Sequence, residues 1–277
     1  MRPSWGLSLV MKAHGSVGFV IGLAVLAGCT GGANPPVPTP PPAPSAATPV
    51  GTESPTPSNQ APSGVTALLR QAASVAAAPF EGEGWRLLLS GDSLNGWEEI
   101  DFAGRGEVRV ESGLVVLGMG SPFTGLRYTN AFPTMNYEIA LDAMRVMGSD
   151  FFCGLTVPVG DSHCSLIVGG WGGGLVGISS LDGYDASENE TTKFMSFEKG
   201  RWYRVRLRVT PGRLEGWIDQ EKLINVDTRD RRISVRPGEI ERCMPLGIAC
   251  WETGAAVRTV QWRPVSGPAG PLPGKRN

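Results

Sequence analysis

The clearest signal in the chain is the alternation of apolar and polar residues at 202–210. Four apolar residues alternate with three arginines there: Tyr203, Val205, Leu207 and Val209 with Arg204, Arg206 and Arg208. Successive side chains of a β-strand point to opposite faces, so the segment predicts a strand with one apolar and one charged face. Pro-Gly at 211–212 and Asp-Gln at 219–220 predict turns into further strands at 213–218 and 222–226.

Similar short runs, punctuated by glycine, recur over most of the chain. They predict strands at 136–144, 151–157, 163–168, 175–179, 246–251 and 257–263. No long helical periodicity and no repeat of fixed length interrupts them. The pattern predicts an all-β fold at 80–265, as a two-sheet antiparallel β-sandwich rather than a barrel.

One helix is expected before the sandwich. Its apolar positions between 65 and 78 fall on one helical face: Val65, Leu68, Leu69, Ala72, Val75 and Ala76. This pattern predicts a short helix at 64–79 that packs against the sandwich or links to it.

The first 28 residues have the pattern of an export signal. Arg2 and Lys12 supply positive charge, and the apolar run at 17–27 is too short to span a bilayer, which takes about 20 residues. The sequence LAGC at 26–29 resembles the lipobox of bacterial lipoproteins, in which Cys29 would be lipidated and become the new N-terminus. The alternative is an ordinary secretory signal with a chance cysteine.

Residues 29–63 are rich in Pro, Ala, Ser and Thr and have almost no large apolar side chain. Such a segment cannot bury a core, so we expect a disordered, extended tether between the lipid and the domain. A tail at 266–277 follows the sandwich. The localisation expected from these features is the cell envelope, lipid-anchored at the periplasmic or outer-membrane surface.

Charge argues against a nucleic-acid partner. Removal of residues 1–28 takes away two of the 25 basic residues and no acidic one, which leaves 23 against 26 and a net charge of −3. No large basic patch survives that count. His14 is removed as well, so His163 is the single histidine of the mature chain.

Four cysteines follow Cys29. Cys153 and Cys164 flank a predicted turn at 158–162, so an exported domain could pair them across two strands, and two buried free thiols are the alternative. Cys243 and Cys250 are separated by an odd number of residues, which disfavours a local pairing. A zinc site is not predicted, because His163 and Cys164 would point to opposite faces of one strand.

Standard hydrolase motifs are missing. There is no His-Glu-x-x-His and no nucleophile elbow. Glu138 and Asp142 share one face of a predicted strand, but four strand residues span roughly 13 Å, whereas paired glycosidase carboxylates lie about 5 to 9.5 Å apart. The catalytic strand of lectin-like glucanases carries Glu-x-Asp-x-Glu, and the segment EIALD at 138–142 lacks the central acid.

The segment 169–192 is a candidate binding region. Trp171 stands among five glycines, so its indole can be open for stacking on a sugar, or folded into the core at a bend. The loop that follows offers Asp182, Tyr184, Asn189 and Glu190, which could bond sugar hydroxyls or ligate calcium, or form a plain solvated loop. No cofactor is expected otherwise.

Several segments in order resemble one bacterial domain family. They are WRLLLSGDSLNGW at 85–97, VRVESGL at 108–114, KGRWYRV at 199–205 and WID at 217–219. Together they resemble the 3-keto-disaccharide hydrolases, over residues 82–264. The segment 151–192 departs from the family pattern.

The resemblance implies a concanavalin-like jelly roll and a lyase–hydratase that acts on 3-keto-glycosides. Such chemistry needs a base, an acid and a group that holds an enolate oxygen. His163 is the candidate base by its ordinary pKa, with Glu138 and Asp142 as alternates and Arg145 as a candidate substrate ligand.

Three functional hypotheses remain open at this point. The first is the 3-keto-glycoside lyase or hydratase. The second is a non-catalytic surface module that binds a glycoside or oligosaccharide. The third is a structural envelope lipoprotein whose sandwich serves protein contacts.

Overall fold

The computed structural model describes residues 64–266, and the predicted signal peptide, Cys29, the tether and nearly all of the predicted tail lie outside that range. The described chain is an antiparallel β-sandwich, which confirms the predicted fold class. No helix within it is long and apolar enough to cross a membrane.

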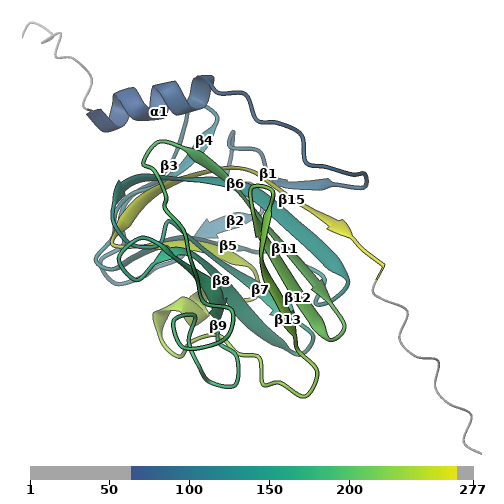
Figure 1. The fold of residues 1–277 in the computed structure, drawn as a ribbon. Helices are drawn as coiled ribbons and strands as arrows, with labels where there is room; N and C mark the ends of the chain where they lie inside the picture. The colour runs from purple at the N-terminus through teal and green to yellow at the C-terminus, as the bar shows by residue number, and fades with distance from the viewer. Residues whose placement is uncertain (1–63, 267–277) are drawn as a thin grey trace, which may run out of the picture. The chain divides into compact units, whose positions relative to one another are not determined.

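We call the first sheet sheet A. Its strand order is β13-β12-β11-β6-β15-β4-β3, and β1 pairs with β15 (Figure 1). The bounds are β1 Arg86–Leu89, β3 Val108–Glu111, β4 Leu114–Leu117, β6 Tyr137–Gly148, β11 Trp202–Thr210, β12 Arg213–Ile218, β13 Glu221–Asp227 and β15 Thr253–Pro264.

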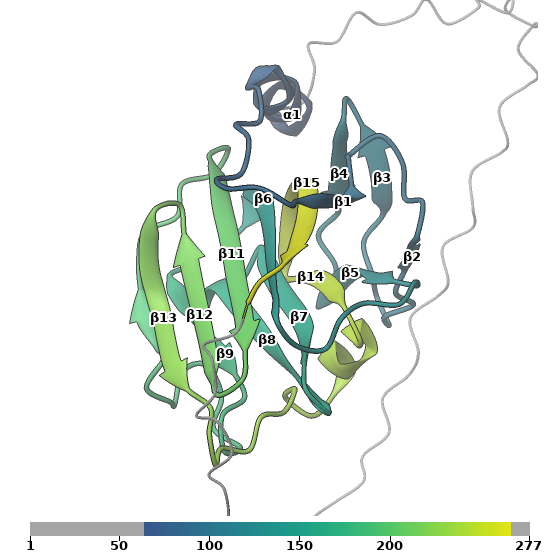
Figure 2. The same ribbon diagram turned by 90° about the vertical axis from the view of Figure 1, so that its right-hand side faces the viewer.

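Sheet B has the order β10-β9-β8-β7-β14-β5-β2 and stacks on sheet A (Figures 1 and 2). Its bounds are β2 Trp97–Glu99, β5 Phe123–Tyr128, β7 Cys153–Val159, β8 Ser162–Gly170, β9 Leu175–Ser179, β10 Lys193–Phe194 and β14 Gly247–Trp251. A short 3-10 helix, η1 (Glu239–Cys243), precedes β14.

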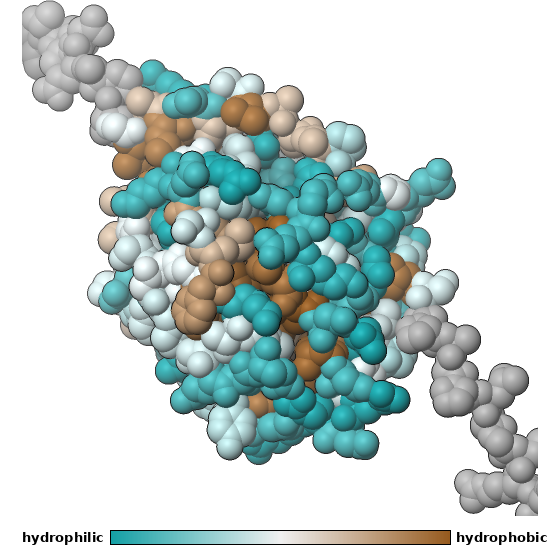
Figure 3. Space-filling model, viewed as in Figure 1, coloured by the Kyte–Doolittle hydropathy of each residue, from teal (hydrophilic) through white to brown (hydrophobic). Residues whose placement is uncertain are grey.

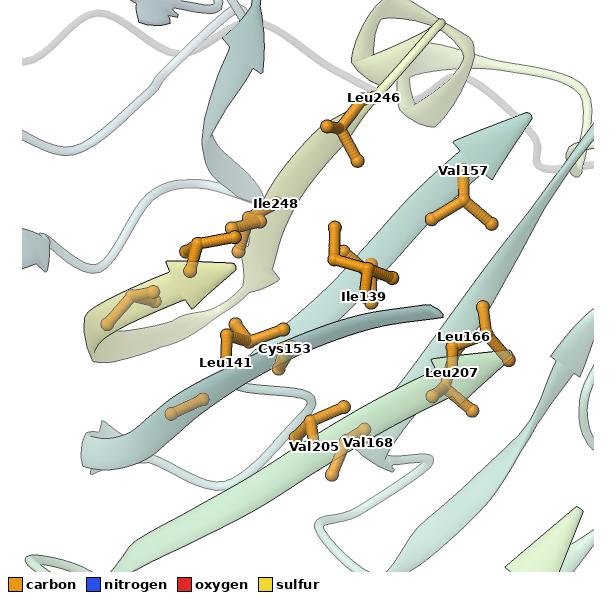
Figure 4. Packing of buried hydrophobic residues seen from close by; sticks show 14 of the residues in the cluster. Ile139, Leu141, Cys153, Val157, Leu166, Val168, Val205, Leu207, Leu246 and Ile248 are labelled. Atoms are coloured by element: carbon orange, nitrogen blue, oxygen red, sulfur yellow. The ribbon is translucent and has the colours of Figure 1, made fainter. Parts of the chain in front are cut away.

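The main core lies between the sheets and follows from strand alternation. Ile139 and Leu141 of β6 and Val205 and Leu207 of β11 point inward from sheet A. Their counterparts in sheet B include Cys153, Val157, Leu166, Val168, Leu246 and Ile248 (Figure 4). All of these side chains are at least 99% buried. The apolar face predicted for 202–210 is therefore the face that joins the two layers.

The other face of β6 and β11 carries the charges. Glu138 pairs with Arg206, Arg208 and Arg263, at 3.2, 2.9 and 3.2 Å. Asp142 pairs with Arg204 at 3.0 Å and Arg258 at 3.5 Å. The two carboxylates thus sit on the outer face of sheet A in a lattice of five arginines.

Helix α1 (Gly64–Ser74) packs beside this lattice on sheet A. It buries Leu69 and Ala72 against a cluster that includes Leu114, Met144 and Ala256. Apolar surface remains along α1 and in the middle of the face seen in Figure 3, which is otherwise mostly polar. The helix ends earlier than its apolar pattern predicted, because residues 75–83 leave it as an irregular segment whose carbonyls at Val75, Ala78 and Pro79 accept hydrogen bonds from Arg258 and Arg204.

The predicted disulfide between Cys153 and Cys164 is wrong. Cys153 lies opposite Val168 and Cys164 opposite Val157, so the two cysteines are four residues out of register, roughly 13 Å apart. A disulfide needs Cα atoms within about 7 Å. The cause is the turn, which centres on Gly160 and Asp161 and leaves Cys153 much farther from it than Cys164. All four cysteines of the described chain are buried free thiols.

Candidate functional site

A groove of about 420 Å³ lies on the outer face of sheet B, on the opposite side of the sandwich from α1. Ile167 of β8 and Phe151, just before β7, lie in its floor. The β8–β9 turn with Trp171 lines one side, and the segment 236–240 that leads into η1 lines another. A volume of this size is typical of small-molecule sites.

One end of the groove is aromatic. Phe123 starts β5 and Trp251 ends β14, and their rings meet edge to face with centroids 4.6 Å apart. Phe151 lies 6.1 Å from Phe123 and 6.4 Å from Trp251, and Phe102 stacks on Phe123 at 4.9 Å. These contacts fix the rings as one rigid cluster.

The other end is polar. The Asp185 carboxylate accepts hydrogen bonds from the Ser179 hydroxyl at 2.5 Å and the Ala186 N–H at 2.8 Å. Its second oxygen pairs with the Arg236 guanidinium at 2.7 Å. The Asp185 side chain is only 14% exposed whereas that of Arg236 is 60% exposed. Asp185 therefore holds a cation that extends into the groove.

A second carboxylate, Asp150, is held by backbone amides. Its Oδ1 accepts the Phe151 N–H at 2.7 Å and its Oδ2 accepts the Gly172 N–H at 3.2 Å. Its own N–H donates to the Thr253 hydroxyl at 2.9 Å. Each carboxylate oxygen retains acceptor capacity for a ligand, because an ionised carboxylate offers about four lone-pair sites.

The buried side chain of Arg145 supports the part of the groove that carries Asp150 and Trp171. It is 5% exposed, and its Nη2 donates to the carbonyls of Asp150, Gly169 and Gly173 at 3.1, 3.0 and 2.8 Å. Nη1 donates to the Phe197 carbonyl at 3.3 Å. Burial lowers the pKa of the guanidinium. Arg145 thus reaches the backbone of the Trp171 turn from inside the protein.

Close contacts explain why glycines occupy the turn between β8 and β9. A Cβ on Gly169 would lie 2.5 Å from Nη2 of Arg145, and one on Gly173 would lie 2.8 Å from the Ser149 carbonyl. Trp171 has a left-handed φ of 48° and is 43% exposed. Of the two readings of this indole, the exposed one is confirmed.

Among the predicted site residues, Trp171 alone lines the groove. His163 shares its sheet face but lies four residues from Ile167 on β8, roughly 13 Å away. Burial lowers the pKa of the His163 imidazole. Glu138 and Asp142 lie on the far sheet, bound to arginines, and Arg145 lies beneath the groove.

Most polar side chains of the predicted loop are already bonded to other groups of the protein. Asp182 and Glu190 both pair with Arg231 at 2.5 Å. The Asn189 amide donates to the carbonyls of Ile178, Tyr184 and Asp185, and Tyr184 is exposed but outside the groove.

The predicted site residues did not include several polar or aromatic side chains that line the groove, among them Asp150, Ser179, Asp185, Arg236, Glu239 and Trp251. Two local signals were present. Asp185 belongs to the polar loop noted in the sequence, and Asp150 precedes a predicted strand. Nothing local marks Arg236.

Within residues 64–266, no three His, Cys, Asp or Glu side chains gather as metal ligands. Calcium binding stays a prediction that the described residues do not address.

Comparison with known proteins gives one family match. No curated protein matches the chain. Among solved structures, a β-glucanase from Bacillus licheniformis is 10% identical with a TM-score of 0.44, over 66% of this chain and 99% of its own. The carbohydrate-binding module CBM66 from Bacillus subtilis is 12% identical with a TM-score of 0.41, over 63% of this chain and 96% of its own. The family model that matches residues 84–263 is described as a 3-keto-alpha-glucoside-1,2-lyase-like domain, and the chain belongs to that family.

Proposed function

We propose that the groove on sheet B binds a glycoside and that the protein cleaves 3-keto-glycosides by elimination followed by hydration. The observation that carries the proposal is one groove that combines an amide-held carboxylate, a carboxylate-held arginine and an open indole: Asp150, Arg236 and Trp171. Membership of the family favours the same chemistry.

The reaction suits these groups. A ketone at C3 acidifies the hydrogen on C2, and a base removes that proton to form an enolate. The enolate re-forms the ketone as C1 and C2 become doubly bonded and the C1–O bond breaks, and the leaving oxygen takes up a proton. Water then adds its hydroxyl to C1 and its hydrogen to C2, which gives the free 3-keto sugar. The site must supply a base and a charge beside the enolate oxygen.

In this proposal Asp150 is the base, because among residues 64–266 its carboxylate accepts hydrogen bonds from backbone N–H groups alone and keeps acceptor capacity for the C2 proton. Arg236 stabilises the enolate oxygen, since a cation placed where charge develops lowers the barrier. Asp185 and Ser179 are positioning residues that hold Arg236. Trp171 offers its face to the C–H groups of the sugar.

The test is aglycone release from a 3-keto-glucoside and from its unoxidised parent. We expect release from the keto form alone, because only its C2 hydrogen is acidic. Asp150→Asn should lower the rate about 10²- to 10⁴-fold, the usual contribution of a general base. Asp161→Asn, a change in the exposed β7–β8 turn, is the matched control. Release from both compounds would mean ordinary glycoside hydrolysis and would contradict the proposal.

A second candidate function is a binding module without catalysis. Two observations favour it. The Asp185 carboxylate already accepts from the Ser179 hydroxyl, the Ala186 N–H and Arg236, and the His163 imidazole does not line the groove. Its signature is sugar binding without release from any compound, with the binding lost in Trp171→Ala. If no sugar binds, the third hypothesis remains, a structural protein of the envelope.

We also propose that the protein is a lipoprotein of the cell envelope, anchored through Cys29, as the LAGC motif at 26–29 favours. The wild type should sediment with membranes and Cys29→Ser should not. Equal behaviour of the two proteins would remove the anchor.

A further inference from the structure

The groove runs diagonally across sheet B between its two chemically different ends. Trp251 belongs to β14 and Ser179 to β9, which are three strand spacings apart, about 14 Å. Ala249, Gly154, Ile167 and Gly177 form one row across the sheet. Trp251 lies two residues to one side of that row and Ser179 two residues to the other, about 13 Å along the strands.

The site therefore has room for two linked rings, with Ile167 beneath the middle of the groove and with Asp150 and Trp171 on the same side of that row as Trp251. Hydrogen-bonding groups concentrate at one end, where Ser179, Asp185 and Arg236 lie. A sugar ring, which carries several hydroxyls, fits that end.

The opposite end presents Pro122, Phe123, Trp251 and Ile240. None of these four side chains accepts a hydrogen bond, and only the Trp251 indole N–H can donate one. The Glu239 carboxylate, which also lines the groove beside Ile240, is paired with Arg242 at 3.5 Å. A second sugar placed there would leave most of its hydroxyls without a hydrogen-bond partner, which weakens binding. An aromatic ring would instead join the edge-to-face cluster of Phe123, Phe151 and Trp251.

We propose that the groove is built for glycosides whose aglycone is an aromatic ring, the sugar at the Asp185–Arg236 end and the aryl group against Trp251. This substrate class rests on the proposed function. In the elimination, the C1–O bond breaks towards a phenolate, which takes a proton from water to become a phenol. A phenolate is a good leaving group, because the pKa of a phenol such as tyrosine is about 10.

Binding of unoxidised compounds to the intact protein separates this inference from leaving-group effects. Calorimetry with phenyl glucoside, methyl glucoside and a glucose disaccharide of the same anomeric form should give roughly tenfold tighter binding of the phenyl compound, the ratio expected for one added aromatic contact of about 1.4 kcal/mol. Trp251→Leu should remove that advantage and leave methyl glucoside within twofold. Tyr184→Ala, an exposed aromatic outside the groove, should change nothing.

Trp251→Phe, which keeps a ring against Phe123, should retain part of the advantage. If the Leu variant does not fold, the wild-type series and this variant decide. Equal affinity for the phenyl compound and the disaccharide overturns the inference, even if every 3-keto form is cleaved. A phenyl preference without cleavage of any 3-keto form overturns the proposed function and leaves this inference standing.

Discussion

Replacing Arg145 by methionine tests the role of the buried guanidinium most directly. The change removes four hydrogen bonds to the carbonyls of Asp150, Gly169, Gly173 and Phe197. The Gly169 carbonyl is the buried one, and an orphaned buried acceptor costs about 1–3 kcal/mol. The other three are partly buried and can recover water, so each should cost less. Removal of the buried charge offsets part of this cost, so we expect the free energy of unfolding to fall by about 2–4 kcal/mol.

Two measurements report on this variant. Urea unfolding gives the global loss, and hydrogen exchange followed by mass spectrometry should show faster exchange at 169–174, the turn that carries Trp171. Affinity for a glycoside should fall with it, because the indole and the Asp150 carboxylate lose their support. Arg145→Lys keeps the charge but not the fork of donors, so it should recover only part of the loss.

Arg213→Met is the matched control, since the Arg213 side chain is exposed and its hydrogen bond within the described chain goes to the Asn225 side chain. It should alter the free energy of unfolding by less than about 0.5 kcal/mol. If Arg145→Met unfolds at the same urea concentration as the wild type and exchange at 169–174 is unchanged, the reasoning about this arginine is refuted.

Three further predictions follow from burial and charge. Burial raises the pKa of the four thiols within residues 64–266, that of Cys153 included, to about 12. Iodoacetamide at pH 8 should therefore label none of these four in the native protein and all four in urea, and rapid native labelling of any of them would contradict this. Burial lowers the pKa of His163, so the free energy of unfolding should decrease as pH falls below about 6.5. A His163 pKa of about 6.5 or higher by NMR titration, or an unchanged pH dependence of stability in His163→Gln, would count against this. Hydrogen bonds from the Arg232 main chain and from Arg231 lower the pKa of Asp182, and the hydrogen bond from Arg231 lowers that of Glu190, so their stabilisation is present above about pH 4 and lost on acidification. Arg231→Gln should therefore have a lower Tm than the wild type at pH 7, and the difference in Tm should shrink near pH 3. An undiminished difference at pH 3 would argue against the pairing.

The sandwich was predictable because its signal is local. Alternation at 202–210 places Val205 and Leu207 on the buried face whatever strands lie beside them, and β11 forms there as expected. Even the strand at 175–179 has its predicted bounds.

Charged residues were harder to interpret, because a sequence shows which strand face they occupy but not what that face meets. Glu138 and Asp142 resembled half of a catalytic pattern, and their arginines come from β11 and β15, far along the chain. The groove depends on register in the same way. Asp150, Asp185, Arg236 and Trp251 belong to four separate segments that only the folded sheet brings together.

The strap at 75–83, which crosses the outer face of sheet A, bears on where a recombinant domain should begin. The family match starts at residue 84, yet carbonyls before that position complete the arginine lattice. Arg258 bonds the Val75 carbonyl, and Arg204 bonds those of Ala78 and Pro79 at 2.6 and 2.9 Å.

A protein cut to 84–263 would lose these acceptors and would expose the apolar cluster that α1 covers on sheet A. We expect it to aggregate or to melt well below a protein that begins at residue 64, and equal melting temperatures of the two would show the strap to be dispensable. The family boundary marks what relatives share in sequence, whereas the unit that folds here includes about twenty residues more.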